Sequence, residues 1–160
     1  IHGRVMNQEL RDITAVSWAE LVKDAPELAA FGERRLDGKV SYLATVREDQ
    51  RPRLHPVTPI IGRGHCFLFV EPITPKARDL QVNGFFSLHC GMNDSSGSSG
   101  EFLVSGRVQL VDDKEMRVLA ESVSSYRPAS RAVLFELLLN EASATEYRGG
   151  RASRKKWRGQ

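Results

Sequence analysis

The sequence predicts a mainly β protein, a six-stranded antiparallel barrel with a few flanking helices. Two observations support this fold class. Short runs rich in β-branched and aromatic residues recur along the chain, and the segments between them are short and rich in Gly, Pro, Asn and Asp. Helical patterns are few and brief, so we expect the sheet to bury its apolar face by closing into a small barrel.

The first half of the chain is expected to form one short helix followed by a meander of three strands. Apolar residues between 17 and 31 share a helical period, and Ser17 is a suitable N-cap. Pro56 and Pro59 fall inside the second strand. Because proline removes a ladder donor, that strand should lie at a sheet edge or carry a bulge. The three strands are expected at residues 40–46, 53–61 and 66–70.

The second half is expected to contain two helices and three further strands. One helix begins at Thr74, and Asp112 or Asp113 caps the other. Residues 131–147 have the length of a helix but lack a clean 3.6-residue period, which favours a long, partly buried strand. The other two strands are expected at 85–90 and 102–111, with a loop at 93–100 that is too polar to pack.

The helix that starts at Thr74 carries an unfavourable charge pattern. Thr74 suits the N-cap and Pro75 suits the first helical position. Lys76 and Arg78 then place cations at the positive end of the helix dipole, which costs about 0.3–1 kcal/mol per charge at low salt. A bound anion would reverse the sign, because free N–H groups and cations together suit a phosphate. The alternative is a solvated helix start that tolerates its cations.

Length and composition indicate one globular domain over residues 1–160, with its core at about 17–147. The chain is 41% hydrophobic and 27% charged, as is usual for such a domain. Met6 is a candidate start residue. No apolar run approaches the roughly 20 residues that span a bilayer, and no signal-peptide pattern opens the chain. We therefore expect a cytoplasmic protein.

Basic residues crowd the C-terminal tail, residues 148–160, and account for the net charge of +3. Such a tail is expected to be a solvated end or an arm that closes over an anionic ligand. Nucleic-acid binding is the weaker alternative, because no basic face with interleaved aromatic residues accompanies the tail.

Cysteine, histidine and serine patterns give neither a metal site nor a catalytic side chain. Cys66 and Cys90 lie in apolar runs without metal-ligand spacing, so we expect buried free thiols, with a cross-strand disulfide as the alternative. His65 and His89 have no second ligand nearby in the sequence. No serine lies in a nucleophile elbow.

Six segments carry a family resemblance by their order and spacing. They are Tyr42–Val46 (YLATV), Arg51–Val57 (RPRLHPV), Phe67–Phe69 (FLF), Thr74–Leu80 (TPKARDL), Phe86–His89 (FSLH) and Glu101–Gly106 (EFLVSG). Together they resemble the pyridoxamine 5'-phosphate oxidase-like, FMN-binding split-barrel family over about residues 17–147. The resemblance implies a homodimer of six-stranded split barrels, with FMN in a groove between the two subunits.

The resemblance also implies which residues hold the cofactor phosphate. Lys76 would contact the phosphate, and Thr74 would cap the helix and hydrogen-bond the same group. Arg78 is a second phosphate candidate. Arg53 would reach the region of the ribityl chain and the phosphate.

Further contacts are implied along the flavin ring. The backbone at His55, Pro56 and Val57 would run beside the isoalloxazine, which agrees with a proline-interrupted strand whose backbone groups are not fully paired. His55 is also the best-placed side chain to meet flavin or substrate. Trp157 would approach the flavin from the C-terminus, or it would anchor the tail.

The implied function is that of an FMN-dependent oxidoreductase acting on a small molecule. Thr58 stands where the oxidase itself has a lysine, and a C-terminal Arg-x-His signature is absent, so pyridoxamine phosphate is not the expected substrate. One alternative is a non-catalytic flavin-binding or sensor module. Another is a deazaflavin-dependent reductase on the same fold, in which the basic tail would meet the longer acidic cofactor.

Overall fold

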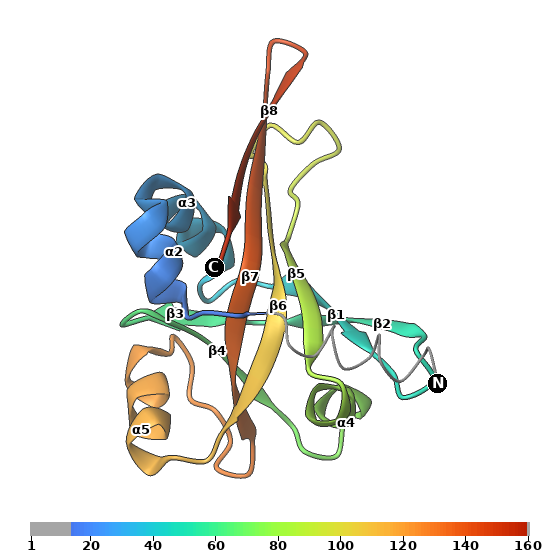
Figure 1. The fold of residues 1–160 in the computed structure, drawn as a ribbon, viewed down its shortest axis with the longest axis vertical. Coiled ribbons are helices and arrows are strands. Elements are labelled where there is room, and N and C mark those ends of the chain that lie inside the picture. The colour runs from blue at the N-terminus through green and yellow to red at the C-terminus, as the bar shows by residue number, and fades with distance from the viewer. Residues whose placement is uncertain (1–13, 160) are drawn as a thin grey trace.

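The computed structural model describes residues 14–159, and Met6 lies outside them. In this part of the chain one antiparallel sheet has the strand order β2-β1-β5-β6-β7-β4-β3, with β8 added beside β7. Strands β6 and β7 run along the long axis of the molecule, and β1 and β2 cross them steeply (Figure 1). The strands are β1 (Ser41–Val46), β2 (Pro52–Val57), β3 (Ile60–Gly62), β4 (His65–Val70), β5 (Phe85–Cys90), β6 (Glu101–Val111), β7 (Val133–Arg148) and β8 (Arg151–Arg158).

Helices lie on opposite sides of these strands: α2, α3 and α5 on one side, and α4 beside β1 and β5 on the other (Figure 1). The short helix expected after Ser17 is confirmed as α2, but where the chain was expected to leave the helix a second helix, α3, begins at Pro26. Proline disfavours the helical conformation of the preceding residue, and Ala25 has φ −144° and ψ 70°. The described helices are α2 (Trp18–Asp24), α3 (Pro26–Leu36), α4 (Pro75–Val82) and α5 (Lys114–Val123).

The proline-containing segment supplies both edges of the sheet. The single strand expected at 53–61 is two strands, with β2 paired to β1 and β3 paired to β4. The expectation of an edge strand is confirmed, since β2 and β3 stand at opposite ends of the strand order. Because Pro59 follows β2 closely in the chain, the two edges lie next to one another and the sheet curls into a split barrel.

The long strand favoured at 131–147 is confirmed as β7. It pairs with β4, β6 and β8, so it is the strand that joins the two halves of the barrel. The register of β6 and β7 shifts between Ser105 and Gly106, because β7 has an extra residue there, Asn140, and the two backbones come close at this bulge. A Cβ atom on Gly106 would lie 1.8 Å from the carbonyl oxygen of Leu138, so only glycine fits this position.

The basic tail forms a strand that was not expected, while its cations are exposed, as expected of a solvated end. Strand β8 pairs along β7 from Arg151 to Arg158, and the hairpin between them extends past the body of the protein (Figure 1). Trp157 is 8% exposed, and its indole N–H donates to Asp24 Oδ2 at 3.0 Å. The tail is ordered because one aromatic side chain enters the core while the neighbouring cations remain in water.

Other expectations about buried groups have mixed outcomes. Cys66 and Cys90 are free and buried, as predicted. The loop at 93–100 is mostly exposed, as expected, although Gly97 and Gly100 are buried and Arg35 donates to the carbonyl oxygen of Gly100. Across residues 14–159, no helix has the length and apolarity needed to cross a bilayer.

The anchoring of β8 by Trp157 can be tested by substitution. Trp157→Ala should lower the free energy of unfolding by about 3–5 kcal/mol, because it empties a buried aromatic site, and Trp157→Phe by about 1 kcal/mol through loss of the bond to Asp24. Denaturant unfolding measures both values. Arg151→Ala is the control, since its side chain is exposed and pairs at the other end of β8 from Trp157, and an equal loss of stability there would contradict this role of Trp157.

Candidate functional site

Three elements meet where β2 lies beside β1 and helix α4 begins. In the antiparallel register Arg53 is opposite Thr45 and His55 is opposite Leu43. Arg53 and His55 therefore project to the side of Thr45 and Leu43, which are buried. Pro56 projects to the opposite, outer face of the sheet.

A buried carboxylate holds this junction together. Asp79 on α4 is 6% exposed, and its Oδ2 accepts a hydrogen bond of 2.8 Å from the Thr45 hydroxyl. The same oxygen accepts from Arg53 Nε at 2.8 Å. His55 Nε2 lies 3.2 Å from Thr45 Oγ1. Thr45 and Asp79 were not among the predicted site residues. For Asp79 the sequence held one signal, an acidic residue between the apolar Ala77 and Leu80 on the face of a predicted helix.

Among the described residues, Lys76 is the predicted site cation without an anionic partner. Its side chain is half-buried, and among the described residues it makes no ion pair or side-chain hydrogen bond. It lines a hollow of about 330 Å³ that also includes the predicted residues Pro56 and Val57. The other residues around this hollow are Thr58, Leu68, Phe69, Glu71 and Tyr126.

A second hollow, of about 280 Å³, is also lined by residues of α4 and contains Arg53 and Arg78. Arg78 donates to Glu48 Oε2 at 3.0 Å, which pairs its charge. Both side chains are largely exposed. Arg47 also lines this hollow, and its buried Nε has no hydrogen-bond acceptor among the described residues. Arg47 and Lys76 are thus the cations of this region left without an ion pair within residues 14–159.

Thr74 occupies the predicted N-cap but does not cap with its side chain. Its backbone is extended, with φ −80° and ψ 150°. The hydroxyl donates instead to the carbonyl oxygen of Glu71 at 2.7 Å. The expectation that this hydroxyl caps the helix is therefore wrong. The cause is local, since Thr74 closes a turn with Glu71, and the first helical amides remain without a side-chain acceptor.

The electrostatics of the junction keep His55 neutral near neutral pH. Burial lowers the pKa of His55, and the positive charges of Lys76 and then Arg53 lower it further, against a smaller opposing effect of Asp79. As the pH falls below the usual histidine pKa of about 6.5, His55 is therefore protonated in the unfolded chain before it is protonated in the folded protein. The contribution of His55 to stability is present at higher pH and is lost as the pH falls through that range.

The structure does not bring Trp157 to this junction within one chain. Trp157 sits on β8 and bonds to Asp24 of α2, while Arg53 and Lys76 lie on β2 and α4. This position matches the alternative of an ordinary anchor for the tail. Within residues 14–159, no three His, Cys, Asp or Glu side chains gather as a metal ion would require.

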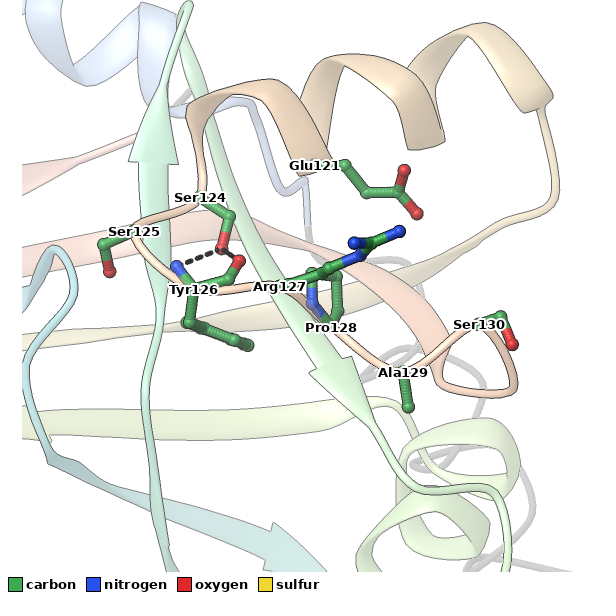
Figure 2. A pocket seen from close by; sticks show the side chains of 8 residues that line it. All are labelled: Glu121, Ser124, Ser125, Tyr126, Arg127, Pro128, Ala129 and Ser130. Carbon is green, nitrogen blue, oxygen red and sulfur yellow. Dashed lines mark hydrogen bonds between the residues drawn. The ribbon is translucent and has the colours of Figure 1, made fainter.

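The most spacious hollow described, about 900 Å³, lies in the connection between α5 and β7 and holds none of the predicted residues. Figure 2 shows the side chains that line it, among them Glu121 and Arg127, with Ser124 bonded to the backbone of Tyr126. Tyr126 also borders the hollow of Lys76. This connection therefore forms one wall of the Lys76 hollow.

Removing the charge of Lys76 should raise the pKa of His55. In Lys76→Met the cation that disfavours imidazolium is gone, so the NMR titration of His55 should move towards the ordinary histidine value. Arg78→Met is the matched control, because Arg78 is paired with Glu48 and is not among the charges acting on His55. An unchanged His55 titration in Lys76→Met would contradict the described geometry.

Comparison with known proteins gives matches in structure alone. No family model and no curated protein matches the sequence. A heme-binding protein from Mycobacterium smegmatis superposes with a TM-score of 0.61 and 19% identity, over 79% of this chain and 57% of that one. This chain thus spans little more than half of the mycobacterial protein.

Other solved structures are matched over most of their length. A NimC/NimA family protein from Clostridium acetobutylicum has a TM-score of 0.58 and 17% identity, over 88% of this chain and 94% of that one. An F420 reductase has a TM-score of 0.53 and 17% identity, over 69% of this chain and 94% of that one. The chain therefore has the split-barrel fold of the pyridoxamine 5'-phosphate oxidase-like proteins, as the sequence predicted.

Proposed function

We propose that this chain binds FMN where β2 meets the start of α4, and that it acts as an FMN-dependent oxidoreductase on a small molecule. One observation carries the proposal. Lys76 is half-buried and has no anionic partner among the described residues, although it stands beside Arg53 and His55. A cation held in this way, at the positive end of a helix, is suited to a phosphate.

The residues present fit the phosphate of FMN. The side chain of Lys76 and its backbone N–H supply donors, because Pro75 has no N–H and the N–H groups of Thr74 and Ala77 donate to backbone carbonyls. The orphaned Nε of Arg47 supplies another donor, in the hollow that contains Arg53. Arg53 is held in place by Asp79 and uses only its Nε in that bond, so its two terminal nitrogens can bind ligand oxygens.

The flavin ring would lie along the free edge of β2. Among the described strands, β2 pairs with β1 alone, which leaves backbone groups on its other side for the polar edge of a ring. FMN, when bound, supplies hydride or electron transfer, while the chain binds and orients the cofactor and limits water. No acid or base from the chain is required, in accord with the absence of a catalytic motif in the sequence.

Two alternatives use the same residues. A flavin-binding or sensor module would bind FMN without turnover, and NAD(P)H consumption by the FMN-loaded protein separates it from an enzyme. A deazaflavin-dependent reductase is favoured by the exposed cations of β8, which suit a longer acidic cofactor tail. Heme, which one structural neighbour is described as binding, is a third ligand for the binding assay.

We also propose a homodimer formed through the outer face of the sheet. The register places one residue from each of six strands in a single row on this face. Large apolar groups stand in and beside the row, with Tyr42 46% exposed, Leu54 68% and Leu103 36%. An apolar face of this kind on a sheet is a typical association surface. The row consists of Pro56, Tyr42, His89, Leu103, Ser143 and Lys156.

FMN affinity should depend on Lys76. Lys76→Ala should weaken binding by about tenfold to a hundredfold, the effect of losing one charge-assisted hydrogen bond. Arg78→Ala should weaken it less, because that guanidinium is already paired with Glu48. Quenching of flavin fluorescence on titration measures the affinities. Arg51→Ala, which removes an exposed cation paired with Asp49, is the control, and equal effects at Arg51 and Lys76 would refute the site.

Dimerisation and FMN binding should fail together. Tyr42→Asp places a charge on the outer face, so light scattering after gel filtration should report about half the molar mass of the parent, and FMN affinity should fall because the cofactor groove is lost. Val118→Asp, at a 65% exposed position on α5, should leave both unchanged. A monomeric parent protein would contradict this part of the proposal.

A further inference from the structure

The hydroxyl of Thr45 stands between two partners and has one proton to give. Its Oγ1 lies 2.8 Å from Asp79 Oδ2 and 3.2 Å from His55 Nε2. A carboxylate can only accept, so the hydroxyl proton is directed to Asp79. The bond to His55 must then run the other way, with Nε2–H donating to Thr45 Oγ1.

We propose that Thr45, held by Asp79, is a positioning residue that locks His55 in its Nε2–H tautomer and leaves Nδ1 as the hydrogen-bond acceptor of the ring. No described residue hydrogen-bonds to Nδ1. A neutral imidazole has one donor and one acceptor nitrogen, so fixing the first determines the second.

The charges around His55 support the neutral ring that this arrangement requires. Arg53 on the same strand and Lys76 on α4 both disfavour imidazolium, and Asp79 on α4 is the opposing charge. Asp79 is also bonded to Arg53 through the same Oδ2 that accepts from Thr45. One carboxylate oxygen therefore sets the orientation of Arg53 directly and that of His55 through Thr45.

This arrangement defines the chemistry of the ligand. The cations require an anion, and the free Nδ1 requires an N–H or O–H donor on the same molecule. FMN meets both conditions through its phosphate and through its ribityl hydroxyls or ring N–H. The assignment of FMN as the ligand rests on the proposed function, whereas the tautomer of His55 is a property of the protein without ligand.

The tautomer can be measured by NMR on the ligand-free protein with nitrogen-15-labelled histidine at pH 8. His55→Gln identifies the signals of His55. In the parent protein Nε2 should give the shift of a protonated nitrogen and Nδ1 that of an unprotonated one. Thr45→Val, which keeps the shape and removes the hydroxyl, should give a mixture of tautomers, and Thr45→Ser should restore the single form.

An Nδ1–H tautomer or a mixture in the parent protein would overturn the inference, as would a single Nε2–H form that persists in Thr45→Val. Because Thr45 is fully buried, Thr45→Val can fail to fold; the parent and Thr45→Ser spectra then decide the outcome.

The acceptor role is tested separately by FMN titration. His55→Phe keeps a planar ring at this position and has no acceptor nitrogen, so its affinity for FMN should fall about tenfold, the effect of one hydrogen bond. Unchanged affinity would overturn the acceptor role. A parent protein that shows the Nε2–H tautomer but does not bind FMN would refute the proposed function and leave the tautomer intact.

Discussion

The buried carboxylate of Asp79 is the constraint on which the candidate site depends. A carboxylate that is 6% exposed is costly unless donors surround it, and here Thr45 and Arg53 supply them from two neighbouring strands. These bonds fix helix α4 against the edge of the sheet. They also occupy Arg53 and direct His55, while Lys76, three residues earlier on the same helix, keeps its charge unpaired within the described chain. The unequal pairing of neighbouring cations makes this region suited to an anion.

Much of the fold could be predicted because its signals are local. Prolines marked β2 as an edge strand, and the turn residues placed most strand boundaries within a few positions. The split between α2 and α3 was also a local signal, since Pro26 disfavours a helical Ala25, but the apolar period across it masked the break. Strand β8 was missed because alternating side chains are hard to see among so many cations, and Trp157 alone marks its buried face.

The site was predicted less completely, for a physical reason. Lys76 and Thr74 could be found from the helix-start pattern, but the role of Thr74 depends on a turn with Glu71 that sequence does not specify. The bond between Thr45 and Asp79 joins residues from different elements, and only the register of β1 with β2 and the packing of α4 bring them together. Pairing also decides the role of Arg78, whose partner Glu48 lies on another turn.

In the proposed function, this junction holds FMN once a second copy of the chain completes it. The most direct test is a visible absorption spectrum of the purified protein after incubation with FMN and gel filtration. Flavin bands that co-elute with a species of dimer mass are the predicted result. A protein that elutes without flavin absorbance after incubation with excess FMN would contradict the claim.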